Sequence, residues 1–159
     1  MERFYTPEVI AKLMIDLIKP ITAPASAIDI CSGSWNLLKE AKNRWPSIKL
    51  TGVDTDPSSK NHSVKYSNFY CMDGRQYALD SLKQNRKYSL LLANPPFAEE
   101  KLKNQKPFSN LPGYSRIKTQ ALRRLETTMI LANLSILNAT GFAAIVVPFT
   151  VIYGDSLRS

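Results

Sequence analysis

The chain has 159 residues, of which 44% are hydrophobic and 21% charged, and this balance fits one globular domain. It has no apolar run long enough for a membrane helix and no signal peptide before Met1-Glu2-Arg3, so we expect a cytoplasmic protein without a membrane partner. Cys31 and Cys71 are too few for a disulfide framework, and His62, the single histidine, excludes metal sites and triads that need several. The net charge of +8 favours a polyanion such as nucleic acid as a partner.

Helical and extended patterns alternate along the chain. Thr6 is predicted as the N-cap of a helix over about 7–19, which Pro20 ends. Strands are predicted at 27–31, 49–57, 68–72, 88–93 and 142–148, the last buried by its continuous apolar run. Helices are predicted between 34 and 45, at 75–82 and at 119–138, the last closed by Thr140-Gly141, with a short helix near 58–64 and an irregular stretch at 98–120. This alternation predicts an α/β fold with a doubly wound, mainly parallel sheet.

Two strand ends carry residues suited to a nucleoside. Ser32-Gly33-Ser34 joins a strand to a helix, and such turns cradle ligands at the carboxyl ends of strands. Asp54 ends the next strand, where a carboxylate can accept both ribose hydroxyls. Asp56-Pro57 is predicted to cap the helix or turn that follows.

The fourth strand runs into Asn94-Pro95-Pro96-Phe97. Pro96 has no N–H, and Pro95 keeps Asn94 out of the helical conformation, so the Pro95 carbonyl stays free beside an amide and an aromatic ring. Two carbonyl acceptors and one stacking face suit a planar amino group on a flat heterocycle. Most Asn-Pro pairs are simply turns at strand ends, and that interpretation is the alternative.

Asn94-Pro95-Pro96-Phe97 resembles the catalytic motif of amino-group methyltransferases that use S-adenosylmethionine. From Phe4 to about Ser159 the chain resembles the N6-adenine DNA methylase family of restriction-modification systems. The resemblance implies a Rossmann-like methyltransferase fold with strand order 3-2-1-4-5 and methyl transfer to the N6 amino group of adenine in DNA. It also implies that Asn94, Pro95, Pro96 and Phe97 are catalytic.

By the same resemblance, S-adenosylmethionine is bound by Thr6, Asp29, Gly33, Asp54 and Asp73. Thr6 belongs to a Phe4-Tyr5-Thr6-Pro7 turn like the one that contacts the methionine end. Asp73 stands where the family accepts the adenine amino group of the cofactor, although a helix cap or Asx turn explains it nearly as well. Trp35 replaces the second glycine of the family's cofactor loop, and its ring either packs away from the site or narrows it.

Positive charge gathers directly after the Asn-Pro-Pro-Phe motif. Between Glu99 and Arg124 there are seven basic and two acidic residues. A solvated surface is the common explanation of such a run, but its place beside the motif favours phosphate contact. The residues expected to bind nucleic acid are Lys101, Lys103, Lys106, Arg116 and Lys118.

We expect residues 1–159 to form one methyltransferase catalytic domain, with an N-terminal helix at 7–19, a cofactor half at 27–82 and a catalytic half at 88–159. Such folds continue beyond the fifth strand, and the DNA enzymes add a target-recognition domain, so the fold is expected to be incomplete at its C-terminus. An exposed edge at the fifth strand would favour self-association, a specificity subunit or a second chain.

Three other functions fit part of the pattern. A methyltransferase acting on RNA adenine or protein glutamine would carry a similar motif. A non-catalytic nucleic-acid-binding or assembly module would account for Trp35. A nicotinamide-dependent dehydrogenase shares the fold class but leaves Asn94-Pro95-Pro96-Phe97 unexplained.

Overall fold

A parallel sheet organises the residues that the computed structural model describes, which are 5–18 and 23–147. Its strands are β1 (Ser26–Asp29), β2 (Lys49–Asp54), β3 (Asn68–Cys71), β4 (Tyr88–Ala93) and β5 (Leu137–Ile145). They lie in the order β3-β2-β1-β4-β5, and every pairing is parallel, so the predicted order is confirmed. Parallel pairing brings the carboxyl ends of the strands to one edge of the sheet, where ligands of such folds bind.

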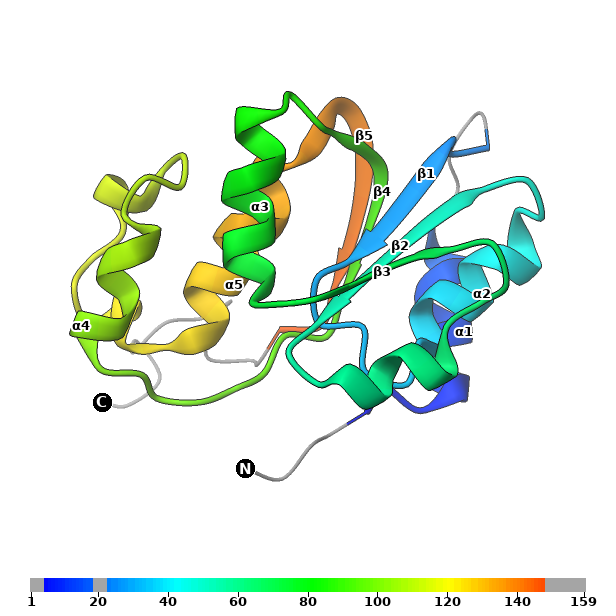
Figure 1. The fold of residues 1–159 in the computed structure, drawn as a ribbon, viewed down its shortest axis with the longest axis horizontal. Coiled ribbons are helices and arrows are strands. Elements are labelled where there is room, and N and C mark those ends of the chain that lie inside the picture. Colours follow the sequence, from blue (N-terminus) through cyan, green and yellow to red (C-terminus); the bar gives the residue numbers. More distant parts are fainter. Residues whose placement is uncertain (1–4, 19–22, 148–159) are drawn as a thin grey trace.

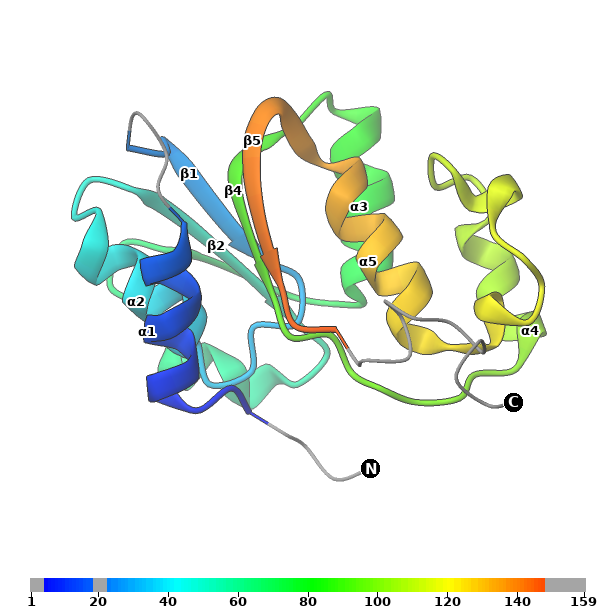
Figure 2. The ribbon, with the colours of Figure 1, turned by 180° about the vertical axis from the view of Figure 1, so that it is seen from behind.

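Helices cover both faces of this sheet, as a doubly wound fold requires (Figure 1 and Figure 2). One face carries α1 (Glu8–Leu17) and α2 (Asn36–Arg44), which pack on each other. The other face carries α3 (Gly74–Lys83) and α5 (Leu125–Ser135), again in mutual contact. No helix in the described ranges is both long and apolar enough to cross a bilayer.

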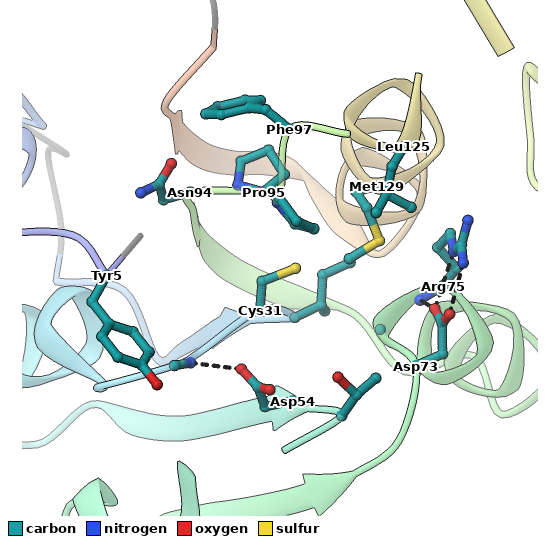
Figure 3. Close-up of a pocket in the computed structure, with 15 residues that line it drawn as sticks. Tyr5, Cys31, Asp54, Asp73, Arg75, Asn94, Pro95, Phe97, Leu125 and Met129 are labelled. Carbon is teal, nitrogen blue, oxygen red and sulfur yellow. Dashed lines mark hydrogen bonds and ion pairs between the residues drawn. The ribbon is translucent and has the colours of Figure 1, made fainter. Parts of the chain in front are cut away.

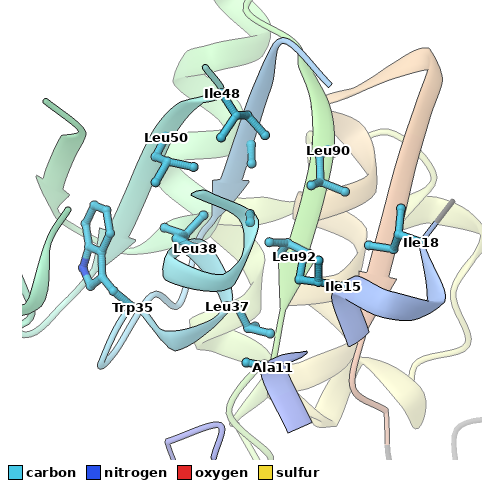
Figure 4. Packing of buried hydrophobic residues seen from close by; sticks show 12 residues of the cluster. Ala11, Ile15, Ile18, Trp35, Leu37, Leu38, Ile48, Leu50, Leu90 and Leu92 are labelled. Atoms are coloured by element: carbon cyan, nitrogen blue, oxygen red, sulfur yellow. The ribbon is translucent and has the colours of Figure 1, made fainter. Parts of the chain in front are cut away.

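Each face of the sheet has its own hydrophobic core. The core under α1 and α2, part of which is shown in Figure 4, includes Ala11, Ile15, Leu37, Leu38, Leu90 and Leu92. The core under α3 and α5 includes Ile28, Val53, Tyr77, Ala78, Met129 and Ala132. Burying each large apolar side chain contributes roughly 1.5–3 kcal/mol, so these two clusters hold the helices on the sheet.

The N-terminal helix forms close to its predicted place, but its predicted cap is wrong. The helix begins at Glu8, Pro7 occupies the N-cap position, and no side chain makes a capping hydrogen bond there. The Thr6 hydroxyl is engaged instead by Asn94, whose side-chain nitrogen donates to it. Phe4, Pro20 and the stretch 149–159, which resembles a family turn, lie outside the described residues.

The long helix predicted for 119–138 is shorter at both ends. Backbone pairing explains its late start: Glu100 N–H donates to the Arg123 carbonyl and Leu125 N–H to the Ala98 carbonyl. This pairing holds Arg124 in an extended conformation, so regular helix begins only at Leu125. At the other end, the predicted stop at Thr140-Gly141 is wrong, because both residues lie inside β5.

The fifth strand is not buried, contrary to the prediction from its apolar run. Its residues are half-buried or exposed, and Phe142 exposes 41% of its surface. In the described part of the chain β5 pairs only with β4 and forms the edge of the sheet. A continuous apolar run therefore does not distinguish a central strand from an edge strand. The described residues leave this edge strand only partly buried.

The segment after the Asn-Pro-Pro-Phe motif is mostly irregular, as predicted. It contains the one-turn helix α4 (Leu102–Gln105) and 3-10 turns at 106–108, 114–116 and 121–123. Figure 1 shows it beyond α3 and α5, on the far side from α1 and α2. A further 3-10 turn at 57–62 matches the short helix expected near 58–64, and Asp56 caps it by accepting from Ser58 N–H.

Candidate active site

The turn after β1 and the end of β2 are joined by a carboxylate. Gly33 has a φ of 46°, and its N–H donates to Asp54 Oδ2 over 2.8 Å. Asp54 Oδ1 accepts from the N–H of Asp56 at 2.9 Å, so both oxygens are oriented by backbone. A carboxylate has about four acceptor positions, and Asp54 therefore keeps capacity for further hydroxyl donors from the cavity that it lines.

Trp35 occupies the second glycine position of the loop without entering the cavity. Its φ of 65° is the left-handed conformation that a glycine would adopt freely. The ring is fully buried in the α1–α2 core, as Figure 4 shows, and its Nε1–H donates to Ser59 Oγ at 3.2 Å. Of the two expectations for this ring, the structure selects packing away from the site.

Gly52 on β2 makes room for that ring. A Cβ atom built at Gly52 would lie 2.3 Å from Trp35 Cζ2, a distance that van der Waals repulsion forbids. The bulky side chain of Trp35 thus fits because Gly52 on the neighbouring strand has no side chain. Trp35 therefore gives less support to the alternative that the chain is a non-catalytic module.

A cavity of about 630 Å³ lies at the carboxyl edge of the sheet. This volume falls in the range of about 300–1,000 Å³ typical of small-molecule pockets. Figure 3 shows Asn94, Pro95 and Phe97 on one side of it and Asp54 and Asp73 on the opposite side. The predicted site residues that it brings together are Gly33, Asp54, Asp73, Asn94, Pro95, Pro96 and Phe97.

Phe97 leaves 45% of its surface exposed at the mouth of this cavity, and Tyr5, with 48% exposed, lines it as well. Aromatic rings that remain open to solvent beside a pocket offer faces on which a planar base can stack. Asn94 lies deeper and is half-buried.

Thr6 and Asp29 line a small recess beside the main cavity rather than the cavity itself. Asp29 is 2% exposed and its Oδ1 accepts from Cys31 N–H at 2.8 Å. Burial, reinforced by the nearby charge of Asp54, raises the pKa of Asp29 to about 7. The recess therefore contains a carboxyl group that can carry or lose its proton near neutral pH.

Asp73 caps α3, as its alternative interpretation predicted. Its Oδ1 accepts from Arg75 N–H at 2.8 Å, and its Oδ2 forms an ion pair with Arg75 Nη2 at 2.8 Å. The side chain is still 34% exposed and lines the cavity, so the cap does not remove it from the site.

Arg75 is a buried cation that the sequence interpretation did not single out. Only 5% of it is exposed, and Nη1 pairs with Glu100 Oε2 at 2.6 Å while the guanidinium lies 4.0 Å above the ring of Phe108. Although burial disfavours the charge, hydrogen bonds to Asp73 and Glu100 raise the pKa of Arg75. Arg75 therefore connects Asp73, which lines the cavity, to Glu100 in the segment that follows Phe97.

The residues expected to bind nucleic acid do not line the cavity. All five are exposed, and none forms an ion pair with a residue in the described ranges. They extend along the irregular segment that Arg75 anchors through Glu100, Gln105 and Phe108. The residues concerned are Lys101, Lys103, Lys106, Arg116 and Lys118.

Several cavity residues carry no recognisable signal in the sequence. Leu125 and Met129 come from α5, whose helical spacing marks them only as core. Cys31 lies in the turn just after β1 and lines the cavity, and burial raises the pKa of its thiol. Tyr5 is the one that the N-terminal turn motif could have indicated.

A family model described as N-6 DNA Methylase matches residues 1–158. None of the curated protein sequences matches the chain.

Solved structures with the same fold share little sequence with the chain. A Listeria monocytogenes protein assigned to the class I S-adenosylmethionine-dependent methyltransferases has a TM-score of 0.66 at 16% identity, covering 94% of this chain and 46% of its own. A SAM-dependent methyltransferase from Agrobacterium tumefaciens has a TM-score of 0.58 at 13% identity, covering 93% and 48%. The plantazolicin methyltransferase BpumL, solved with SAH, has a TM-score of 0.52 at 17% identity, covering 94% and 49%. At such identities the likeness shows the fold, and the chain spans about half the length of each protein.

Proposed function

The chain belongs to the N-6 DNA methylase family, and we propose that it transfers a methyl group from S-adenosylmethionine to the exocyclic N6 amino group of adenine in DNA. The observation that carries the proposal is the position of Asn94-Pro95-Pro96-Phe97 across one cavity from Asp54 and Asp73. The proposal treats Asn94 and Pro95 as a pair of amino-group acceptors, opposite two carboxylates suited to a nucleoside.

The residues present fit S-adenosylmethionine. Asp54 has acceptor capacity left for the ribose hydroxyls, and Asp73, at the opposite end of the same wall, for the adenine amino group. Gly33 adopts the left-handed conformation in the loop and lines the cavity, and Thr6 and Asp29 line the recess proposed for the methionine end. Trp35 does not obstruct this cradle because its ring lies in the core.

When bound, S-adenosylmethionine supplies an electrophilic methyl group on a positively charged sulfur. Asn94 Oδ1 and the Pro95 carbonyl accept the two hydrogens of the substrate amino group, which turns the lone pair of its nitrogen toward that methyl group. The cofactor, held by Asp54 and Asp73, would supply its methyl group to this nitrogen and keep the electron pair of the sulfur–carbon bond, and the excess proton on nitrogen would leave to water. Phe97 stacks on the base, which has to leave the duplex to reach the cavity. Positioning and electrostatics supply the acceleration.

The exposed cations at 101–118 are proposed to hold the DNA backbone beside the cavity. They form no ion pair with a residue in the described ranges, so binding phosphate breaks no ion pair there. A role in a restriction-modification system extends this proposal, with a specificity subunit, a second chain or a second copy at β5, which is an edge strand within the described part of the chain.

The first experiment is a calorimetric titration of the chain with S-adenosylmethionine. Saturable binding is expected, with a large loss in Asp54→Ala and no change in the control Asp80→Ala, because Asp80 pairs with Lys83 on the surface of α3. Equal binding in all three proteins would contradict the proposed cofactor site.

Transfer is then followed with radiolabelled cofactor on DNA and RNA oligonucleotides and on a glutamine-containing peptide. Label in the N6 position of DNA adenine, lost in Asn94→Ala while cofactor binding persists, is the expected result. Label only in RNA or peptide would replace the substrate class. If Asn94→Ala lost binding and transfer equally, the assigned role of Asn94 would be wrong.

A further inference from the structure

Three segments far apart in the sequence meet in a short chain of hydrogen bonds. Asn36 Nδ2 donates to the Thr6 carbonyl oxygen over 2.9 Å, and Asn94 Nδ2 donates to the Thr6 hydroxyl over 3.1 Å. Thr6 precedes α1, Asn36 opens α2 and Asn94 follows β4. From this geometry we infer that Thr6 is a positioning residue that sets the rotation of the Asn94 amide, and that Asn36 holds Thr6 in place. The inference rests on the proposed function.

The two ends of the Asn94 amide have opposite hydrogen-bonding character. The nitrogen can only donate and the oxygen can only accept. A substrate amino group presents hydrogens, so it needs the oxygen, and a rotated amide would oppose one NH₂ group with another. The last side-chain torsion of asparagine has a broad, roughly two-fold preference, so the residue itself does not select the productive rotation. In the structure the hydroxyl of Thr6 accepts from the nitrogen, and this contact leaves the amide oxygen available to the substrate.

Thr6 is well suited to this task because it is itself immobilised. Only 8% of it is exposed, and it is not used as the cap of α1. Asn36 fixes its backbone from the first residue of α2, directly after the buried Trp35. The turn that is proposed to hold the cofactor therefore also determines where the Thr6 hydroxyl lies.

A direct contact between Thr6 and the cofactor makes a different prediction. Thr6→Val keeps the shape of the side chain and removes the acceptor, whereas Thr6→Ser keeps the acceptor. Under the positioning role, Thr6→Val lowers kcat on the order of 10- to 100-fold, with the Kd of S-adenosylmethionine unchanged, because a misplaced group is costly mainly in the transition state. Thr6→Ser restores kcat. Loss of cofactor affinity with unchanged kcat would overturn the inference.

A matched pair on α2 tests the second link. Asn36→Ala is expected to lower kcat in the same way as Thr6→Val, since the tether on the Thr6 backbone is gone. Asn43→Ala removes an equivalent side chain that lies exposed on the same helix and donates a hydrogen bond to Glu40. Equal kcat values in these two variants would contradict the role of Asn36.

A spectroscopic readout separates this inference from the proposed function. The side-chain NH₂ signals of Asn94 in a ¹H–¹⁵N spectrum can be assigned by their disappearance in Asn94→Asp. They should shift in Thr6→Val and return in Thr6→Ser, whether or not any methyl transfer is detected. Unchanged signals in Thr6→Val would show that the hydrogen bond does not form and would overturn the inference. The expected shifts without detectable methyl transfer would count against the proposed function alone.

Discussion

Replacing Trp35 by glycine tests whether this tryptophan of the cofactor loop stabilises the core without affecting the cavity. The substitution restores the residue that the related loop carries and changes nothing that lines the main cavity. The side chain is fully buried and its Nε1–H is bonded to Ser59. We therefore expect Trp35→Gly to lower stability and to leave cofactor affinity unchanged.

The magnitude follows from two opposing effects. Truncating a buried Trp costs about 3–5 kcal/mol through lost burial and the cavity left behind. Releasing a non-glycine residue from the left-handed conformation, at φ 65°, returns about 1–2 kcal/mol. The added freedom of glycine in the unfolded chain costs roughly 0.5–1 kcal/mol. A net loss of roughly 2–4 kcal/mol is expected, which a domain with a typical stability of about 5–15 kcal/mol survives.

Urea unfolding gives the change in the free energy of unfolding, and the remaining Trp45 serves as the fluorescent probe. Calorimetry on the same sample gives the Kd of S-adenosylmethionine. Trp45→Ala, a half-buried tryptophan at the end of α2, is the control and should cost less. Unchanged stability, or a cofactor affinity improved by on the order of tenfold or more, would refute the conclusion that the ring packs in the core and leaves the cavity open.

Gly52→Ala should destabilise the protein by about 1–3 kcal/mol through its clash with Trp35, and by much less in a Trp35→Gly background, as a double-mutant cycle would measure. For Asp29, a folded-state pKa of about 7 against a usual 3.8 means that the folded protein holds the extra proton, so stability falls as pH rises through this interval. At about 1.4 kcal/mol for each pH unit, the resulting loss in the free energy of unfolding reaches about 4 kcal/mol. Urea unfolding should thus show Asp29→Asn more stable than the parent at pH 8 and similar at pH 4, and equal stability at pH 8 would contradict the burial effect. Arg75→Met should cost about 3–5 kcal/mol, because it leaves the carboxylate of Glu100 without its cation, and an unchanged thermal midpoint would refute the importance of this pair.

The parallel α/β class and the residues at the sheet edge could be predicted from local patterns, whereas the strand order came from the family resemblance. Alternating helices and strands imply right-handed crossovers, and these bring Asp54 and Asn94 to the same edge of a parallel sheet. The start of α5 could not be predicted, since it depends on backbone pairing between Glu100 and Arg123, residues that no local pattern connects. Tertiary pairing overrides helix propensity there.

The role of single side chains was the least predictable part of the site. Thr6 has the sequence context of a helix cap, but the carboxamide of Asn94 lies close enough to use its hydroxyl instead. Arg75 sits in an ordinary helical pattern, and only the fold places Glu100 and Phe108 around it. Such contacts depend on distances between segments, which spacing along the chain does not contain.

The packing of Trp35 on Gly52 also has an evolutionary consequence. Because a Cβ at position 52 would collide with the ring of Trp35, we expect the residue tolerated at position 52 to depend on the residue at position 35. Sequences that share this loop should divide into two groups, those with a small residue at position 35 and free choice at 52, and those with a large aromatic ring at 35 and glycine at 52. An ancestor passing between the two groups would have had to lose the Cβ at position 52 before the ring at position 35 could arrive.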